Sequence, residues 1–487
     1  MLPYSKGKSM NQKISNTRKW MTLSITSIAT FMGTLNSTIV NVALPIMSVE
    51  LKSSINTIQW VISIYLLTTV ILLLVWGKIS DIYGKKYIFA LGMLVFALGS
   101  ALCGFSHTLV MLVGARIVQA IGTSAMFSLS MAIVSSVFSS AERGKALGIV
   151  GAMVAIGTIS GSSLGGILVS VFGWPSIFLI NVPIGIVGAI LSFIFLPEVV
   201  ERQENKSFDI KGTVFFSLFI LLLFMGLLFA QQGVLPVIYL PMVTGIAIAC
   251  LIIFIKVEVR VKSPLLNLEI FHRKEFSFGL ISAYFSFIVL NSTMMFIPFY
   301  LQDILKLGAL KSGMILSVYP ISMGIIAPIS GWLSDRITPR PLTVAGMAVT
   351  TIAMILLATL SQNSSTLEVV VLLAILGSGL AIFQSPNNVR VMGSVPQNQL
   401  GIASGTNALF RYIGMVSGAT LSMIIFSYSS KISINTLNGG FNEYSFMHGV
   451  SSVYIFDAAC ALVAMTFSLI KTTREKEIKS IAHIDNR

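Results

Sequence analysis

The sequence predicts an all-α, polytopic membrane protein with fourteen transmembrane helices, arranged as two six-helix pseudo-symmetric bundles plus two linker helices. Three observations support this fold class: long apolar blocks that recur along the chain, an uneven distribution of basic residues, and an internal repeat. Apolar residues make up 55% of the 487 residues and charged residues only 10%, whereas charged residues are about 25% of a typical soluble domain. Because a soluble core cannot bury that much apolar surface, lipid must cover it.

The apolar blocks have the length of a membrane span. A helix of about twenty residues crosses about 30 Å of hydrocarbon. Lipid offers no partner for backbone N–H and C=O groups, so these segments must be helical. The predicted spans are residues 20–45, 57–77, 87–105, 109–137, 146–170, 175–196, 212–231, 235–255, 276–302, 312–333, 342–360, 367–389, 400–427 and 448–470.

The basic residues orient these spans. With the N-terminus in the cytoplasm, 26 of the 32 Lys and Arg fall in cytoplasmic segments, four in external segments and two inside spans. The positive-inside rule therefore places both termini in the cytoplasm. The basic residues behind the net charge of +14 then orient the protein and contact anionic lipid headgroups on the cytoplasmic side. We therefore expect no nucleic-acid partner. The first apolar stretch is too long for a signal peptide and predicts an uncleaved first helix.

The two halves of the chain repeat each other. Residues 35–38 (Leu-Asn-Ser-Thr) recur at 290–293, the loop at 77–81 is echoed at 331–335, and glycines 144, 148, 157 and 161 reappear at 401, 405, 414 and 418. Repeats of six helices lie parallel, with a binding site between them near the bilayer midplane. The predicted parts are a cytoplasmic tail (1–19), an N-terminal bundle (20–197), a two-helix linker that flanks the bundle (198–274), a C-terminal bundle (275–471) and a second tail (472–487).

Four segments carry a resemblance to a known family. Residues 77–86 (GKISDIYGKK) resemble the signature loop of the major facilitator superfamily. Residues 35–45 (LNSTIVNVALP) resemble the first-helix motif of its fourteen-spanner drug:proton antiporters. Residues 116–122 (RIVQAIG) and 157–166 (GTISGSSLGG) are similar to the fourth-helix motif and to the fifth-helix motif of exporters. The resemblance covers most of residues 20–470 and is specific for the branch, not for the substrate.

The resemblance implies a secondary transporter that works by alternating access, and it suggests gating and packing residues. Asp81 is placed where a helix of the other half can present its positive N-terminus. The alternative is a solvated turn with ordinary positive-inside charges. The predicted gating residues are Gly77, Asp81, Gly84, Lys85, Lys86, Asp335 and Arg336. Glycines four residues apart share one helix face and let a neighbouring backbone approach, which predicts a packing face at Gly157, Gly161, Gly165 and Gly166.

Charged residues inside the spans are candidates for proton coupling. Arg116 is expensive to bury in a membrane, about 2.5–3.5 kcal/mol, and the resemblance makes it a participant in proton transfer. Most relatives carry an acid where this chain has Asn36, which cannot bind and release a proton. Asp457 is then the only acid well inside a span, and Arg411 invites the same interpretation. For each of the three, a purely structural role is the alternative.

The buried charge also bears on the cargo. Two arginines and one aspartate leave an excess of one positive charge inside the spans, which favours neutral or anionic amphipathic compounds over large cations. The predicted substrate cavity is lined by Asn36, Asn41, Tyr65, Asn291, Tyr300, Gln384, Asn387 and Asn388. Each of them is also compatible with ordinary packing.

The sequence contains no phosphate-binding loop, nucleophile elbow or metal-binding His pair, so we expect neither an enzyme nor a cofactor or metal. We expect a monomeric, multi-pass exporter of toxic or amphipathic small molecules against inward proton flow, of the multidrug type that gives antibiotic resistance, in a bacterial plasma membrane. An uncoupled or differently coupled exporter or flippase of a lipid-like or anionic metabolite, and a transport-dead sensor, remain alternatives because Asn36 replaces the usual acid.

Overall fold

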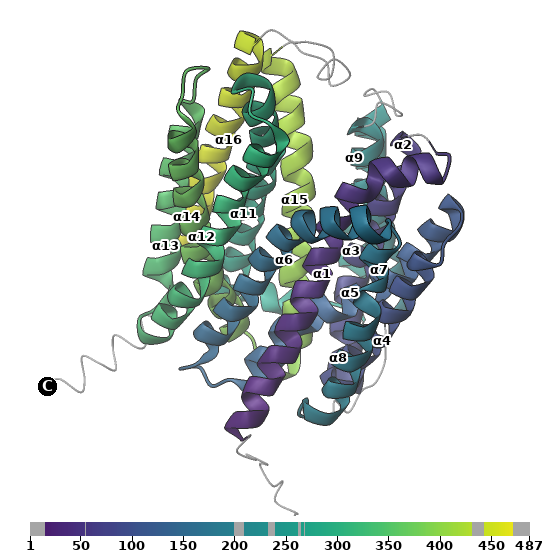
Figure 1. The fold of residues 1–487 in the computed structure, drawn as a ribbon. Coiled ribbons are helices and arrows are strands. Elements are labelled where there is room, and N and C mark those ends of the chain that lie inside the picture. The colour runs from purple at the N-terminus through teal and green to yellow at the C-terminus, as the bar shows by residue number, and fades with distance from the viewer. Residues whose placement is uncertain are drawn as a thin grey trace, which may run out of the picture.

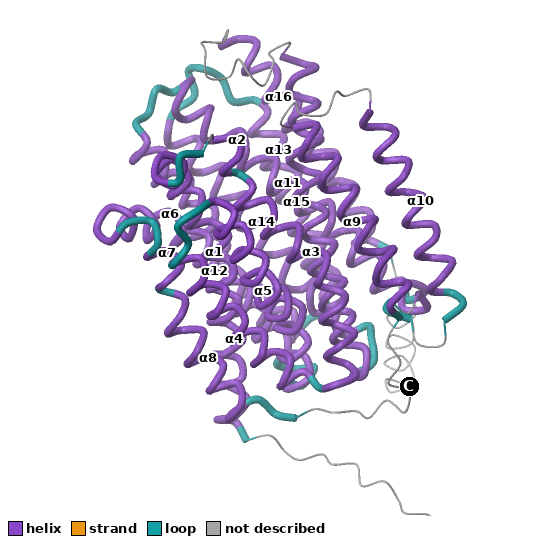
Figure 2. The backbone as a smooth tube through the Cα atoms, turned by 90° about the vertical axis from the view of Figure 1, so that its right-hand side faces the viewer, coloured by secondary structure: helices purple, strands orange, loops and turns teal. Residues whose placement is uncertain are grey.

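A computed structural model describes residues 15–53, 55–198, 209–231, 239–261, 264–266, 268–430 and 443–470. In this part of the chain every regular element is a helix (Figure 2), which confirms the all-α prediction. The helices are α1 (Asn16–Glu50), α2 (Ile55–Ile58), α3 (Trp60–Tyr83), α4 (Lys85–Gly104), α5 (Leu109–Val137), α6 (Arg143–Phe172), α7 (Ser176–Leu179), α8 (Asn181–Phe195), α9 (Ile210–Gln231), α10 (Leu240–Glu258), α11 (Lys274–Phe299), α12 (Ala309–Arg336), α13 (Pro339–Ala358), α14 (Thr366–Gly393), α15 (Leu400–Ser430) and α16 (Glu443–Leu469).

Thirteen helical segments, with α7 and α8 together counted as one, are long and apolar enough to cross a membrane, within the described residues. The remaining candidate is α9, whose qualifying apolar part, Ile210–Gly226, is shorter. A multi-pass membrane protein is therefore shown, whereas the count of fourteen stays a prediction. Large apolar side chains on the outer helices are about half exposed, for example Ile190, Ile329 and Ile355. In a membrane protein this surface is covered by lipid.

The helices form two lobes that lie side by side (Figure 1), with α1 to α8 in one and α11 to α16 in the other. The start of α1 lies against the end of α8, where Arg18 Nε donates to the Phe195 carbonyl oxygen at 2.8 Å. Lys19 pairs with Glu142 just before α6, and Arg340 near the start of α13 donates to Leu469 at the end of α16. The positive-inside rule assigns this shared end to the cytoplasm, and we call it the cytoplasmic end on that prediction.

Equivalent helices of the two lobes make equivalent contacts. Helix α6 packs on α1 of its own lobe and on α12 of the other, and α15 packs on α11 of its own lobe and on α3 of the other. A methyl group added at Gly157 would lie 2.9 Å from the Phe31 carbonyl oxygen, and one at Gly414 would lie 2.5 Å from that of Tyr284. This correspondence is what a duplicated six-helix unit gives. The limits of the predicted domains remain a prediction.

The two linker helices lie at one edge of the molecule, with α10 outermost (Figure 2). Helix α9 begins where Asp209 Oδ1 accepts a hydrogen bond from the Gly212 amide at 2.9 Å. Its side chains Phe216 and Ile220 belong to the same apolar cluster as Leu67 of α3 and Leu409 of α15. Helix α9 therefore covers the line along which α3 meets α15.

Candidate functional site

One contact between the lobes joins Asp81, near the end of α3, to the start of α15. The Asp81 carboxylate accepts hydrogen bonds from the backbone amides of Gly401 and Ile402, both 3.1 Å long. Lys85 forms an ion pair with the same carboxylate at 3.1 Å. A carboxylate at a helix N-terminus is stabilised by unpaired amides and by the helix dipole. Asp81 therefore binds a helix N-terminus of the other lobe, as the sequence predicts.

A second contact repeats this arrangement in the opposite direction. The Asp335 carboxylate, near the end of α12, accepts hydrogen bonds from the amides of Gly144 (2.6 Å) and Lys145 (2.8 Å) at the start of α6. Each lobe thus contributes one acid and one helix N-terminus, and the two contacts hold the cytoplasmic ends of the lobes together. The neighbouring Arg336 places its guanidinium carbon 4.0 Å from the centre of the Trp332 ring. The gating role of these residues remains a prediction.

Glycines bring the lobes into backbone contact beside the two acids. A methyl group at Gly401 would lie 2.7 Å from the Gly77 carbonyl oxygen, and one at Gly405 would lie 2.6 Å from that of Leu73. Across the other line of contact, a methyl group at Gly148 would lie 2.6 Å from the Ala327 carbonyl oxygen. In the sequence, Gly148, Gly401 and Gly405 stand out only as markers of the repeat. Their spacing of four residues was the signal that they form a contact face.

The fifth-helix glycines have a different neighbour. Gly157, Gly161 and Gly165 face α1 of their own lobe, whereas a methyl group at Gly166 would meet no atom within 4 Å. Close packing therefore does not account for Gly166.

In the signature loop, Gly84 ends α3 with a φ of 99°, a conformation that L side chains rarely adopt. Lys86 lies near the Tyr87 ring, at 5.9 Å from its centre.

Arg116 is fully buried within the N-terminal lobe. Its Nε donates to the Val61 carbonyl oxygen (2.9 Å), its Nη1 donates to Gln119 Oε1 (2.6 Å), and its guanidinium carbon lies 3.9 Å from the centre of the Tyr65 ring. Gln119 Nε2 donates to Asn36 Oδ1 at 3.2 Å. Within the described residues no carboxylate forms an ion pair with Arg116. The groups that bind the guanidinium are neutral, so they do not compensate its positive charge.

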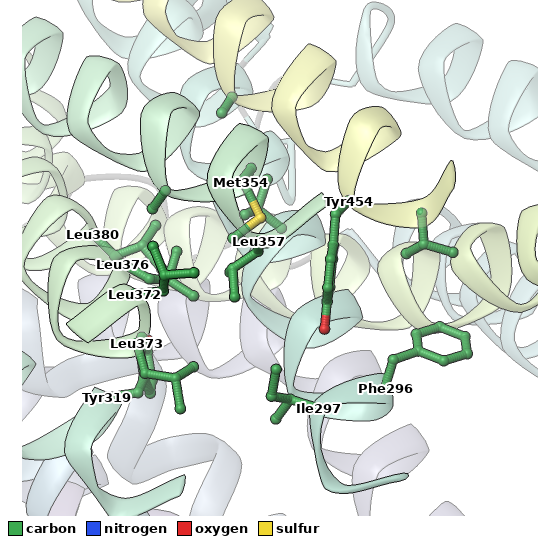
Figure 3. Close-up of a cluster of buried hydrophobic side chains, with 14 of the residues drawn as sticks. Phe296, Ile297, Tyr319, Met354, Leu357, Leu372, Leu373, Leu376, Leu380 and Tyr454 are labelled. Carbon is green, nitrogen blue, oxygen red and sulfur yellow. The ribbon is translucent and has the colours of Figure 1, made fainter. Parts of the chain in front are cut away.

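Asp457 is fully buried in the other lobe. Its helix, α16, packs on α11, α13 and α15. The Ser292 hydroxyl is the polar side chain that interacts with the Asp457 carboxylate, and the buried Tyr454 hydroxyl has no hydrogen-bond partner among the described residues. Figure 3 shows the Tyr454 side chain pointing from α16 into an apolar cluster that includes Phe296 and Ile297. Asp457 therefore lies in an apolar part of the C-terminal lobe.

The third coupling candidate, Arg411, lies between the lobes. Its guanidinium carbon is 5.1 Å from the centre of the Phe127 ring on α5 and 5.0 Å from that of Tyr412. The structure thus places Arg116, Asp457 and Arg411 in three separate environments. Their role in coupling remains a prediction. Within the described residues, Arg116 and Asp457 form no ion pair with each other.

The predicted cavity residues are scattered among several environments. Within one lobe, Asn291 Nδ2 donates to the Met415 carbonyl oxygen (2.7 Å), Tyr300 Oη to that of Ser361 (2.8 Å) and Asn387 Nδ2 to that of Gly279 (3.0 Å). Asn388 accepts from Asn407 at 3.1 Å, and Gln384 Nε2 is buried without a described partner. Asn36 and Tyr65 belong to the Arg116 cluster, and Asn41 is exposed on α1. These bonds are sufficient to explain several of the residues without a substrate.

Comparison with known proteins identifies the family. Residues 26–419 match the family described as Major Facilitator Superfamily. The chain belongs to this superfamily. Riboflavin transporter RibZ of Clostridioides difficile (strain 630) is 34% identical over 465 residues, which cover 94% of this chain and 99% of the relative. Multidrug resistance protein Stp of Mycobacterium tuberculosis is 29% identical over 85% of this chain and 77% of its own length.

A solved structure gives the same picture of the fold. The human organic anion transporter MFSD10 (TETRAN) superposes with a TM-score of 0.65 over 92% of this chain and 99% of its own, at 13% identity. At this identity the likeness concerns the fold alone. The family match and the fold together show that the chain is a multi-pass membrane transporter of the superfamily. Members of this superfamily are generally not enzymes.

Proposed function

We propose that this transporter exports neutral or anionic amphipathic small molecules by alternating access, driven by protons that move inward. The observation that carries the proposal is the reciprocal pair of contacts, Asp81 with the start of α15 and Asp335 with the start of α6. Such contacts exist only while the cytoplasmic ends of the lobes are together. They define one of the two states that alternating access requires.

The energies of these contacts make ligands necessary for the conformational change. Four hydrogen bonds to carboxylates connect the lobes, and a hydrogen bond to a charged group contributes about 1.5–3 kcal/mol. A ligand shifts such an equilibrium only by its differential affinity for the two states. The protonated protein must therefore reach the state in which the cytoplasmic ends are apart, and the substrate-bound protein must return from that state to the closed one.

Asp457 is the residue we propose for the proton. It is a fully buried acid on a membrane-spanning helix, without a cation beside it among the described residues. An intramembrane acid of this kind is a functional candidate by default. Asn36, in the position where most relatives carry an acid, leaves Asp457 as the proposed site of proton binding.

The proposed cargo follows from the buried Arg116 cluster. A buried, uncompensated guanidinium favours substrates with acceptor groups or negative charge and disfavours large cations. The relatives give concrete probes, because one is named a riboflavin transporter and another a multidrug resistance protein. Riboflavin is neutral and rich in acceptor groups, so we propose it as the first test substrate.

The proposal is tested by transport in proteoliposomes with an imposed pH gradient. Antiport predicts that riboflavin accumulates on the acidic side, by about tenfold per proton for each pH unit, since one pH unit is about 1.4 kcal/mol. Asp457→Asn should abolish the gradient dependence, whereas Asp303→Asn, at the external end of the C-terminal lobe, should preserve it.

Accumulation on the alkaline side would indicate symport, and transport that ignores the gradient would indicate an uncoupled carrier; either result contradicts proton-driven export. If coupling survives in Asp457→Asn, the proton-site assignment is wrong. A dicationic dye tested in the same liposomes should be a poorer substrate than riboflavin. Efficient export of the dye alone would contradict the proposed cargo.

A further inference from the structure

A cavity of about 270 Å³ opens at the cytoplasmic end of the line along which α6 meets α12. Its walls come from both lobes. The N-terminal lobe contributes the start of α1, the end of α5 and the start of α6, and the C-terminal lobe contributes the end of α12. The side chains that give the cavity its character are Trp20, Phe138, Glu142, Lys145, Trp332 and Arg336.

The acids of this cavity are already paired, whereas the cations are not. Glu142 accepts from Lys19 at 3.0 Å, and Asp335 accepts from the two backbone amides at the start of α6. The Lys145 ammonium lies 5.5 Å from the centre of the Trp20 ring, and the Arg336 guanidinium 4.0 Å from that of Trp332. Neither cation forms an ion pair within the described residues. The cavity therefore presents two exposed cations that form no ion pair among the described residues, although the Glu142 carboxylate lies close enough to interact with Lys145.

Its aromatic side chains are suited to the membrane interface. Trp20 and Trp332 are 46% and 42% exposed, and both lie at the cytoplasmic ends of membrane-spanning helices. Tryptophan is enriched at the level of the lipid headgroups, where one part of the ring is apolar and another is hydrated. A molecule that fits here carries a negative charge next to an apolar body.

The equivalent line of contact in the other pair of helices is covered by protein. Helix α9 packs on α3 and α15, so the lobes are joined there by part of their own chain. The main packing partners of α9 and α10 do not include α6 or α12. Within the described residues, neither linker helix covers the line between α6 and α12, and the surroundings at this depth of a membrane are lipid headgroups.

We propose that this cavity is a binding site for the phosphodiester headgroup of an anionic phospholipid from the cytoplasmic leaflet. Lys145 and Arg336 contact the phosphate, and the two indole rings contact the glycerol and the first methylenes of the acyl chains. Basic pockets between transmembrane helices on the cytoplasmic side are known to bind such headgroups. Because Lys145 and Arg336 belong to different lobes, a bound headgroup connects the lobes in this conformation.

The test is native mass spectrometry of the full-length protein in detergent, titrated with phosphatidylglycerol, phosphatidylcholine or inorganic phosphate. One phosphatidylglycerol should be retained in preference to phosphatidylcholine. Each basic residue near a membrane surface contributes about 1 kcal/mol, so Lys145→Gln with Arg336→Gln should weaken retention about thirtyfold. The matched control is Lys256→Gln with Arg260→Gln, which removes the same charge from exposed positions on the linker.

Three results would overturn the proposal. Equal losses in the two double variants would mean that the lipid responds to net charge and not to this cavity. Equal retention of phosphatidylcholine would mean that the negative charge is not recognised. Displacement of phosphatidylglycerol by millimolar inorganic phosphate would mean that the site takes a soluble anion. Retention specific to phosphatidylglycerol, lost only in the cavity variant, supports the site.

Discussion

At the scale of single residues, the hydrogen-bond network around Arg116 depends on the side chain at position 36. Gln119 connects them, because its Oε1 accepts from Arg116 and its Nε2 donates to Asn36. Arg116 Nη2 and Asn36 Nδ2 have no described partner. An uncompensated buried charge is costly, and a counter-charge of good geometry reduces that cost. An acid at position 36 would supply the counter-charge.

Asn36→Asp should therefore stabilise the protein and add a proton-binding group. We expect the midpoint of thermal unfolding to rise by about 1–2 °C, as about 1–2 kcal/mol would give in a chain of this size. Riboflavin transport should become more strongly dependent on pH, and cationic dyes should become better substrates. The measurements are a melting curve in detergent and transport assays at several pH values.

The matched control is Asn41→Asp, the same chemical change on the same helix at an exposed position. It should raise neither the melting temperature nor the pH dependence. A melting temperature that falls in Asn36→Asp, with the control unchanged, would mean that the carboxylate is not compensated by Arg116.

The sequence identifies the charged residues of the spans but not their partners. Arg116 and Asp457 stand out because a charge within an apolar block is rare and expensive. Which groups surround them depends on helix rotation, which the sequence leaves open. Polar residues are harder still to interpret. Tyr300 and Asn387 are predicted in the cavity, yet each donates to a backbone carbonyl within its own lobe, which is the packing role that the sequence allows as the alternative.

At the scale of helices, α6 uses glycines on two separate stretches. Near its start, Gly144 and Gly148 face α12 of the other lobe, and further along Gly157 and Gly161 face α1 of its own lobe. Helix α15 repeats the pattern with Gly401 and Gly405 against α3, and with Gly414 and Gly418 against α11. Small residues permit close approach of helices in a membrane. One helix thus carries both a contact between lobes and a contact within a lobe.

Gly148→Ala should separate the lobes at the cytoplasmic end. The added methyl group would lie 2.6 Å from the Ala327 carbonyl oxygen, and overpacking of this kind costs about 1–3 kcal/mol. The amides of Gly144 and Lys145, which donate to Asp335, should then exchange with deuterium about tenfold faster. Hydrogen-exchange mass spectrometry of the peptide that begins α6 measures this.

Gly166→Ala on the same helix is the control, because its methyl group would meet no atom within 4 Å. Both variants gain the same intrinsic helix propensity, so only the contact with Ala327 distinguishes them. Equal exchange rates in the two variants would show that the glycine contact does not hold the lobes together.

The helices themselves follow from apolar length, which is why the spans could be predicted with small shifts at their ends. Two features escaped prediction. The expected span at 175–196 corresponds to one candidate membrane span, Ser176–Phe195, but the break at Ile180 that separates α7 from α8 within it was not expected. Helix α1 continues to Glu50, beyond the predicted end at 45, since amphipathic residues continue a helix past the apolar block.

At the scale of the whole molecule, the repeat gives two acids and two helix N-termini related by pseudo-symmetry. Asp81 and Asp335 belong to different lobes and share no partner. The same conformational equilibrium opens both contacts. Since distant sites contribute additively to one equilibrium, the effects of the two acids on that equilibrium should add in free energy.

Asp81→Asn and Asp335→Asn should each shift the population towards the state with separated cytoplasmic ends. The amide retains only one acceptor oxygen and loses the charge, so each variant should lose about 1.5 kcal/mol, the lower limit for a charged hydrogen bond, or about tenfold in population. The double variant should shift the population about a hundredfold.

Distance distributions between spin labels at the cytoplasmic ends of α6 and α12 report the populations. The control Glu368→Gln, at an exposed external position, should leave them unchanged. If one aspartate variant alone has the full effect of the double variant, the two contacts do not contribute equally to the free energy of the closed state. Pseudo-symmetry would then describe the architecture but not the energetics.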